Sequence, residues 1–116
     1  MKKLLLLATA ICSVNVWADC ASLTTTDEVG FCYSKQVSSL KKQLNQTYMQ
    51  VYKQTEAKKE LDDAQKAWLN YKEKQCGNFT VADAGMNSGQ VVYDLACQSD
   101  LIKYRIKFLK TLLPRS

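Results

Sequence analysis

The 116-residue sequence contains no histidine, and it has one proline and four glycines. Without histidine, a general acid or base near neutral pH would have to be a carboxyl group with a shifted pKa. A zinc site is equally hard to build, because the cysteines lack the close paired spacing of zinc ligands. We therefore expect no catalytic residue, no metal site and no cofactor, and we interpret the protein as a non-enzyme.

The scarcity of helix breakers also predicts the fold class. No glycine or proline occurs between Gly30 and Gly77, which favours long helices. Apolar residues recur every three or four positions along three segments, and this spacing predicts helices over 26–54, 58–76 and 90–113. The sequence therefore predicts an all-α domain in which two long antiparallel helices are covered by a third helix packed across them.

The start of the first helix and the break between the first two helices are each predicted from a few residues. Thr25 and Glu28 have the spacing of a capping box at the start of the first helix. The segment 55–58 contains neither glycine nor proline, so one continuous helix is the alternative to a turn there. We prefer the turn, because a domain this small could not pack a rod of some 50 residues. In the second helix, the predicted buried stripe is Leu61, Ala64, Trp68, Tyr71 and Cys76.

Residues 1–18 have the pattern of a secretory signal peptide. Lys2 and Lys3 precede an apolar run that is too short to span a bilayer, and Ala18 ends a small-x-small cleavage pattern. No cysteine follows a small residue as lipidation would require, so we expect no membrane anchor. The sequence thus predicts an exported protein, periplasmic or secreted, with a single domain over 19–116.

The charge of this domain is mildly positive. Lys2 and Lys3 account for two of the 16 basic residues, which leaves 14 against 11 acidic residues and a net charge of about +3. Nucleic-acid binding usually needs a stronger positive field, and we expect none. We expect a protein partner, and a monomer or at most a weak oligomer.

Removal of the leader takes Cys12 away and leaves four cysteines: Cys20, Cys32, Cys76 and Cys97. An even number of cysteines in a short exported chain is typical of structural disulfides. Their places in the predicted helices favour Cys20–Cys32 and Cys76–Cys97, since each bridge then fastens an irregular segment to a helix. Cys20–Cys76 with Cys32–Cys97 is the alternative.

Several residues form a recognisable series. Leu44, Asn45 and Tyr48 are followed by the run Ala64-Gln65-Lys66-Ala67-Trp68 with Tyr71 and Cys76, and then by Cys97 and Arg105. The order and spacing resemble the LprI lysozyme inhibitor family over nearly the whole domain. We interpret the polar and aromatic members of the series as mainly structural, because they lie on or beside the apolar stripes.

The resemblance implies a protein that docks onto a lysozyme-like glycosidase and blocks its cleft. The alternative is an envelope accessory or immunity-type protein that binds another protein or a wall component. Turn-forming residues are concentrated in 77–90, which predicts one long loop. We expect this loop to bind the partner, and the candidate residues are Asn78, Asp83, Asn87, Ser88 and Tyr93.

Overall fold

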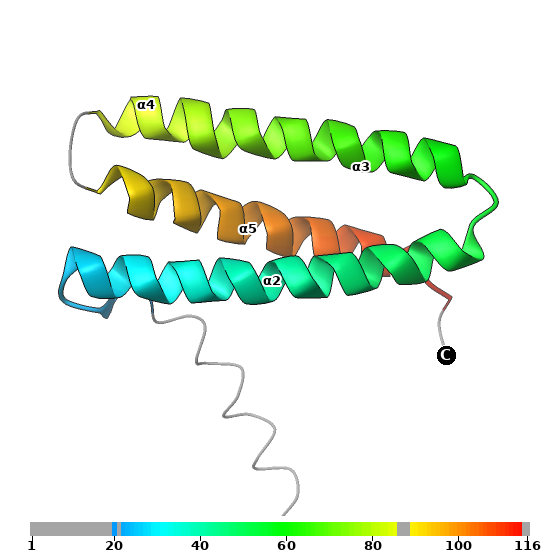
Figure 1. Ribbon diagram of the computed structural model, residues 1–116, viewed down its shortest axis with the longest axis horizontal. Helices are drawn as coiled ribbons and strands as arrows, with labels where there is room; N and C mark the ends of the chain where they lie inside the picture. The colour runs from blue at the N-terminus through cyan, green and yellow to red at the C-terminus, as the bar shows by residue number, and fades with distance from the viewer. Residues whose placement is uncertain (1–19, 21, 86–88, 115–116) are drawn as a thin grey trace, which may run out of the picture.

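The computed structural model describes residues 20, 22–85 and 89–114. The described chain is helical and contains no strand (Figure 1). Its elements are α2 (Thr26–Gln54), α3 (Lys58–Lys72), the π-helix η3 (Glu73–Thr80), α4 (Val81–Ala84) and α5 (Gln90–Lys110). The predicted all-α class with three long helical segments is confirmed. The predicted signal peptide lies outside the described residues.

The first helix begins and ends where the sequence predicts. The Thr25 hydroxyl accepts a hydrogen bond from the Glu28 backbone N–H, and the Glu28 carboxylate accepts one from the Thr25 N–H. This capping box satisfies two of the backbone donors that a helix start leaves open. At the other end, the Thr55 N–H bonds to the Val51 carbonyl before the chain turns. The predicted break between the first two helices is thus confirmed.

The core lies between α2 and α5, which form the most extensive helix–helix contact. Figure 1 shows that these two helices run in the same direction, while α3 runs back between their ends. Apolar residues at helical spacing on the facing sides make this core: Val37, Leu40, Leu44 and Val51 from α2, and Ile102, Ile106 and Leu109 from α5. Burial of these side chains is the main term that stabilises the domain.

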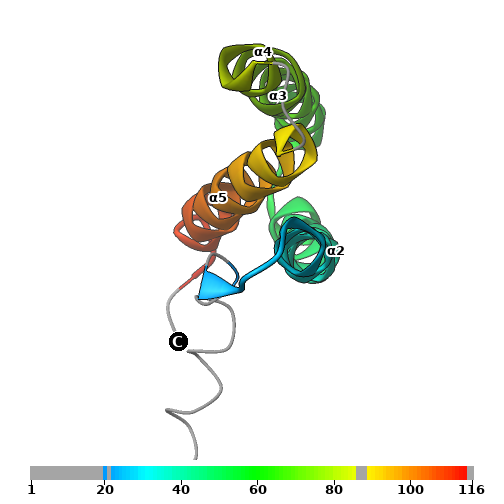
Figure 2. The same ribbon diagram turned by 90° about the vertical axis from the view of Figure 1, so that its left-hand side faces the viewer.

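The second helix is attached more loosely than we expected. Close backbone packing falls between α2 and α5 rather than between α2 and α3, and Figure 2 shows α3 set apart above the other two helices. Ala64 and Tyr71 are exposed, so the predicted stripe was wrong at these two positions. The side chains that do reach the core are Leu61 and Trp68, because a helix held at a distance makes contact along one narrow line.

The loop predicted over 77–90 was wrong for residues 77–84, and so was the end of the helix at residue 76; residues 86–88 of that segment lie outside the described residues. The helix continues through η3 and α4 to Ala84. In η3 the backbone follows the wider i→i+5 pattern, and the Thr80 hydroxyl donates to the carbonyl of Gln75 at 2.8 Å. The actual stop is Gly85, whose φ of 80° suits glycine.

Both predicted disulfides are present. Cys20 is bonded to Cys32, and Cys76 is bonded to Cys97. The second bridge joins η3 to α5 and holds the extended second helix against the third. The third helix starts at Gln90 as expected but ends at Lys110, three residues early, where Leu113 closes a turn by donating to the Lys110 carbonyl.

Candidate functional site

The described residues among those expected to bind a partner lie in helices and share one end of the molecule. Asn78 lies in η3 and Asp83 in α4, and both side chains are exposed. Tyr93 lies in the first turn of α5 and is 51% exposed. Asn87 and Ser88 lie outside the described residues. Helices rather than a loop therefore present the described candidates.

Both disulfides brace this same end. Figure 1 shows the start of α2, the run from η3 to α4 and the start of α5 together on one side of the molecule. We call this region the disulfide end; it comprises residues 20, 22–34, 73–85 and 89–97. Cys20 and Cys76 are each 1% exposed. The helices also approach closely, since a methyl group added to Gly30 would lie 3.7 Å from Val92 Cγ2.

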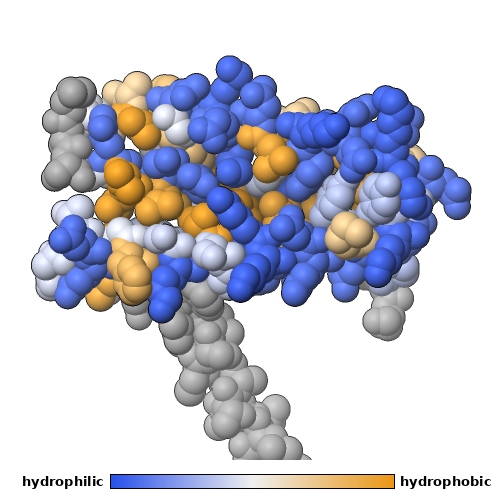
Figure 3. All heavy atoms as spheres, viewed as in Figure 1, coloured by the Kyte–Doolittle hydropathy of each residue, from blue (hydrophilic) through white to orange (hydrophobic). Residues whose placement is uncertain are grey.

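Large apolar side chains are exposed at the disulfide end. In addition to Tyr93, three apolar side chains are exposed in this region: Phe31 (66%), Phe79 (60%) and Val91 (66%). Figure 3 shows hydrophobic residues at the surface of this end on the face it displays. Clustered exposed apolar residues are typical of an interaction site. Sequence reasoning missed these three; the available signal was that Phe31 and Val91 lie off the buried stripes.

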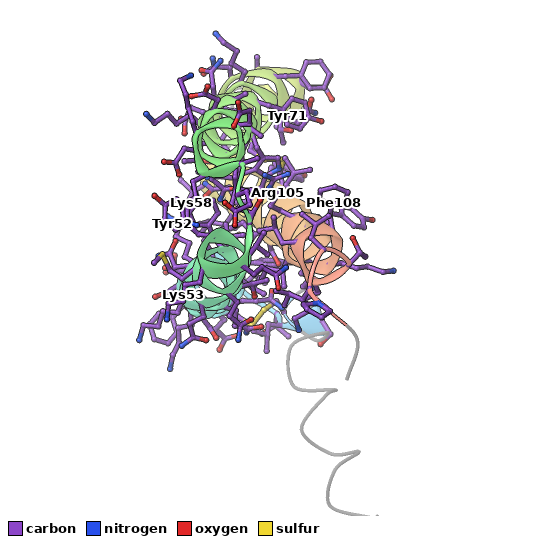
Figure 4. All side chains as sticks on the ribbon, turned by 90° about the vertical axis from the view of Figure 1, so that its right-hand side faces the viewer. Tyr52, Lys53, Lys58, Tyr71, Arg105 and Phe108 are labelled. Carbon is purple, nitrogen blue, oxygen red and sulfur yellow. A yellow bond between two sulfur atoms is a disulfide. The ribbon has the colours of Figure 1, made fainter. Side chains whose placement is uncertain are left out.

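Apart from Cys76 and Cys97, the residues of the family series lie elsewhere, where α3 meets the other two helices. Arg105 Nε donates to Gln65 Oε1 at 2.9 Å, and the Arg105 guanidinium lies 5.8 Å from the ring centroids of both Trp68 and Phe108. Figure 4 shows Arg105 beside the exposed Phe108, with the exposed Tyr71 above them. Burial lowers the pKa of Arg105 from its ordinary value. These contacts fasten the middle of α3 to α5.

The remaining members of the series lie across the gap from α2 to α3. The Tyr48 hydroxyl donates a hydrogen bond to the Asp62 carboxylate, which ties α3 to α2. Leu44, Asn45, Tyr48 and Gln65 all line one hollow between the two helices. Apart from Cys76 and Cys97, whose bridge lies at the disulfide end, the series therefore marks the junction of the three helices.

The described residues contain no group of three or more cysteine, aspartate or glutamate side chains placed to hold a metal ion. Within the same part of the chain, no helix combines the length and the apolar character that crossing a bilayer requires.

Comparison with known proteins agrees with the architecture. The searches of curated proteins and of solved structures gave no match. The model of the family described as "Lysozyme inhibitor LprI" matches residues 18–109, which include both disulfides and all of the three long helical segments except Lys110. The chain therefore belongs to the LprI lysozyme inhibitor family.

Proposed function

We propose that this protein binds a lysozyme-like glycosidase and inhibits it by covering its catalytic cleft. The observation that carries the proposal is the family match over residues 18–109, because the family is described as an inhibitor of lysozyme. The predicted signal peptide supports it, since export would place the protein in the compartment where lysozymes attack the cell wall.

We place the contact with the enzyme at the disulfide end. A protein that blocks a cleft needs a projecting surface that keeps its shape on binding, because ordering a mobile segment would cost affinity. The two disulfides supply such rigidity, and the exposed Phe79, Val91 and Tyr93 supply apolar and aromatic contact area. Aromatic side chains of this kind carry much of the binding energy in protein interfaces.

The polar groups of this end suit the chemistry of a glycosidase cleft. Such clefts contain a pair of carboxyl groups that act on the glycosidic bond. The Asn78 amide and the Tyr93 hydroxyl are exposed hydrogen-bond donors, and we expect them to donate hydrogen bonds to those carboxyl groups. Asp83 lies at the same end, and its carboxylate would suit a basic enzyme surface.

Electrostatic steering contributes little to this proposal. The net charge of residues 19–116 is about +3, and a mildly positive inhibitor gains no long-range attraction to a basic enzyme. We therefore expect the inhibition constant to change little with ionic strength between low and physiological salt.

The test is a lysis assay with the oxidised protein spanning residues 19–116. Micromolar protein should slow the clearing of a bacterial wall suspension by at least one of several lysozyme types. The double variant Val91→Ala/Tyr93→Ala should weaken this inhibition about tenfold or more. The matched control is Tyr104→Ala, which removes a tyrosine that is 68% exposed, against 51% for Tyr93, from the same helix outside the disulfide end.

Full inhibition by the double variant would place the contact elsewhere on the molecule. Failure to slow any lysozyme type would reject the inhibitor function itself. Affinity capture of partners from a periplasmic extract would then identify an envelope protein that binds the same surface.

A further inference from the structure

A hollow of about 410 Å³ lies between α2 and α3, away from the disulfide end's exposed aromatic residues. α2 and α3 form its two walls, and Ile102 of α5 lies at its floor. Figure 3 faces the gap between these helices and shows hydrophobic residues there, bordered by hydrophilic ones. The residues that line it are Lys41, Leu44, Asn45, Tyr48, Asp62, Gln65, Lys66, Leu69, Lys72 and Ile102.

The two ends of this hollow differ in the side chains that line them. At one end, the Tyr48 hydroxyl donates to the Asp62 carboxylate and closes the gap. At the other end, Lys41 of α2 and Lys72 of α3 line the walls. Positions 41 and 48 are about 10 Å apart along a helix, so the hollow is short, with one closed end and one positively charged end.

The charge at the open end is not balanced. Three lysines line the hollow against the single carboxylate of Asp62, which is already engaged by Tyr48. The Lys72 side chain is only 8% exposed, and its ammonium donates to a neutral amide oxygen, Gln98 Oε1, at 3.4 Å. A buried ammonium group is costly unless an anion compensates it.

The pKa of Lys72 reflects this environment. Burial is the largest cause that lowers it, and the positive charge of Lys41 lowers it further. The carboxylates of Glu73 and Asp94 act in the opposite direction without restoring the ordinary value. An additional negative charge near Lys41 and Lys72 would therefore be favourable.

We propose that this hollow binds a small anionic amphiphile, with its carboxylate or phosphate between Lys41 and Lys72 and its short apolar chain against Leu44, Leu69 and Ile102. Leu69 is 45% exposed although it lines the hollow, so an apolar chain would cover it. The Asn45 and Gln65 side chains add polar groups along the walls.

The size of the hollow favours this occupant. Its volume of about 410 Å³ falls in the range of small-molecule sites, about 300–1,000 Å³, whereas an α-helix of a partner is about 10 Å across with its side chains and would need a larger volume. A purely apolar ligand would leave the lysines uncompensated. An inorganic anion would leave Leu69 uncovered.

Calorimetric titration of the oxidised protein tests the proposal with four matched probes: decanoate, decyl phosphate, decyltrimethylammonium and inorganic phosphate, each below its micelle concentration. Decanoate or decyl phosphate should bind at one site per chain, and their ratio tells which anionic group is preferred. The cationic probe and inorganic phosphate should bind at least tenfold more weakly. Equal binding of the cationic probe would overturn the proposal, as would phosphate binding as tightly as decyl phosphate.

Variants locate the site. Lys41→Gln/Lys72→Gln should weaken binding of the anionic probe at least tenfold, and Leu69→Gln should weaken it about threefold or more. The control Lys42→Gln/Lys53→Gln removes the same charge from exposed positions of α2 outside the hollow. If the two double variants lost affinity equally, the attraction would be unspecific and the proposal wrong. Should the double variant fail to fold, Lys41→Gln alone carries the test, because Lys41 is exposed.

Binding should also take up protons above neutral pH. The anion would raise the lowered pKa of Lys72, so the titration heat should depend on the ionisation enthalpy of the buffer, and more strongly with decanoate than with inorganic phosphate. A heat that is independent of the buffer at pH 9–10 would overturn the placement of the anion beside Lys72. The inference does not rest on the proposed inhibition, since the Val91→Ala/Tyr93→Ala variant should bind decanoate normally.

Discussion

Ser99 of α5 donates a hydrogen bond of 3.2 Å to the Gln36 side-chain oxygen of α2, and both residues are 1% exposed. The pair lies in the interface between the two best-packed helices, beside an otherwise apolar core. Buried polar groups are tolerated when they bond to each other, and they then specify which surfaces can meet. This pair therefore helps to fix the register of α5 on α2.

Loss of one partner of this pair should be more damaging than loss of both. Ser99→Ala should lower the free energy of unfolding by about 1–3 kcal/mol, because Gln36 loses a buried donor. Gln36→Met/Ser99→Ala should recover part of that loss, since apolar groups replace both polar ones. Urea denaturation of the wild type, both single variants and the double variant gives the coupling energy. Additive effects would show that the hydrogen bond contributes nothing specific.

Each disulfide should contribute to stability mainly by restricting the unfolded chain. The bonded cysteines are 12 and 21 positions apart, and the loop-closure estimate is about 3 kcal/mol for each bridge. Cys20→Ala/Cys32→Ala and Cys76→Ala/Cys97→Ala should each lower Tm by about 10 °C or more. Thermal unfolding followed by circular dichroism measures both values; a change below 2 °C in either variant would contradict the estimate.

Arg105 should not be replaceable by lysine. Lysine keeps the charge but loses the planar group that bonds to Gln65 and lies over Trp68 and Phe108. Arg105→Lys should cost about 1–2 kcal/mol, whereas Lys103→Arg at an exposed position of the same helix should be neutral. Trp68 is the only tryptophan in residues 19–116, so its fluorescence reports both the contact and the unfolding. Equal stability of the two variants would deny Arg105 this role.

Lys72 makes the stability depend on pH in a defined direction. Its folded pKa is lowered below the ordinary 10.5, by burial first and by Lys41 second. The unfolded chain then binds the proton more tightly, so the cost of the buried charge is present at pH 7 and is relieved as pH rises through the folded pKa towards 10.5.

Replacement of Lys72 by methionine tests this sign. Lys72→Met should raise Tm at pH 7 by a few degrees, since about 1 kcal/mol corresponds to roughly 4–8 °C in a domain this small. The gain over the wild type should shrink at pH 10, where Lys72 is increasingly neutral. Calorimetric Tm values of both proteins at pH 7 and pH 10 test the sign of this contribution. A gain in Tm that grows with pH would show that the charge of Lys72 stabilises the fold.

Much of the fold could be predicted because local signals and burial agree there. The capping box at Thr25 and the continuous stripe from Val37 to Val51 defined α2 to the residue. The order of the predicted helices favoured the observed disulfide pairing over the alternative of Cys20–Cys76 with Cys32–Cys97. At Gly77 and Asn78, turn-forming residues suggested a loop, but the bridge at Cys76 and the packing of η3 on α5 keep them helical. Tertiary contacts here outweigh local preference.

The candidate sites were predictable only in part. The sequence offered Asp83 and the nearby Tyr93 as candidates, yet it placed Asp83 in a loop, and it gave no sign that Phe31 and Phe79 would be exposed at the same end of the molecule. The hollow was not foreseen either, because it depends on α3 lying away from α2. The stripe of Leu61, Ala64 and Tyr71 suggested close packing, and apolar spacing alone does not tell how far apart two helices lie.

The bridge between Cys76 and Cys97 has a further consequence for a protein exposed to proteases. It closes a covalent ring that contains the end of η3, all of α4 and the first two turns of α5. A single cut of the backbone anywhere in this ring would open it without releasing a fragment, and both cut ends would stay beside the helices they came from. The proposed docking surface would thus stay attached after one backbone cleavage in the ring, whereas the same cleavage in a chain without the bridge would separate the two parts of that surface.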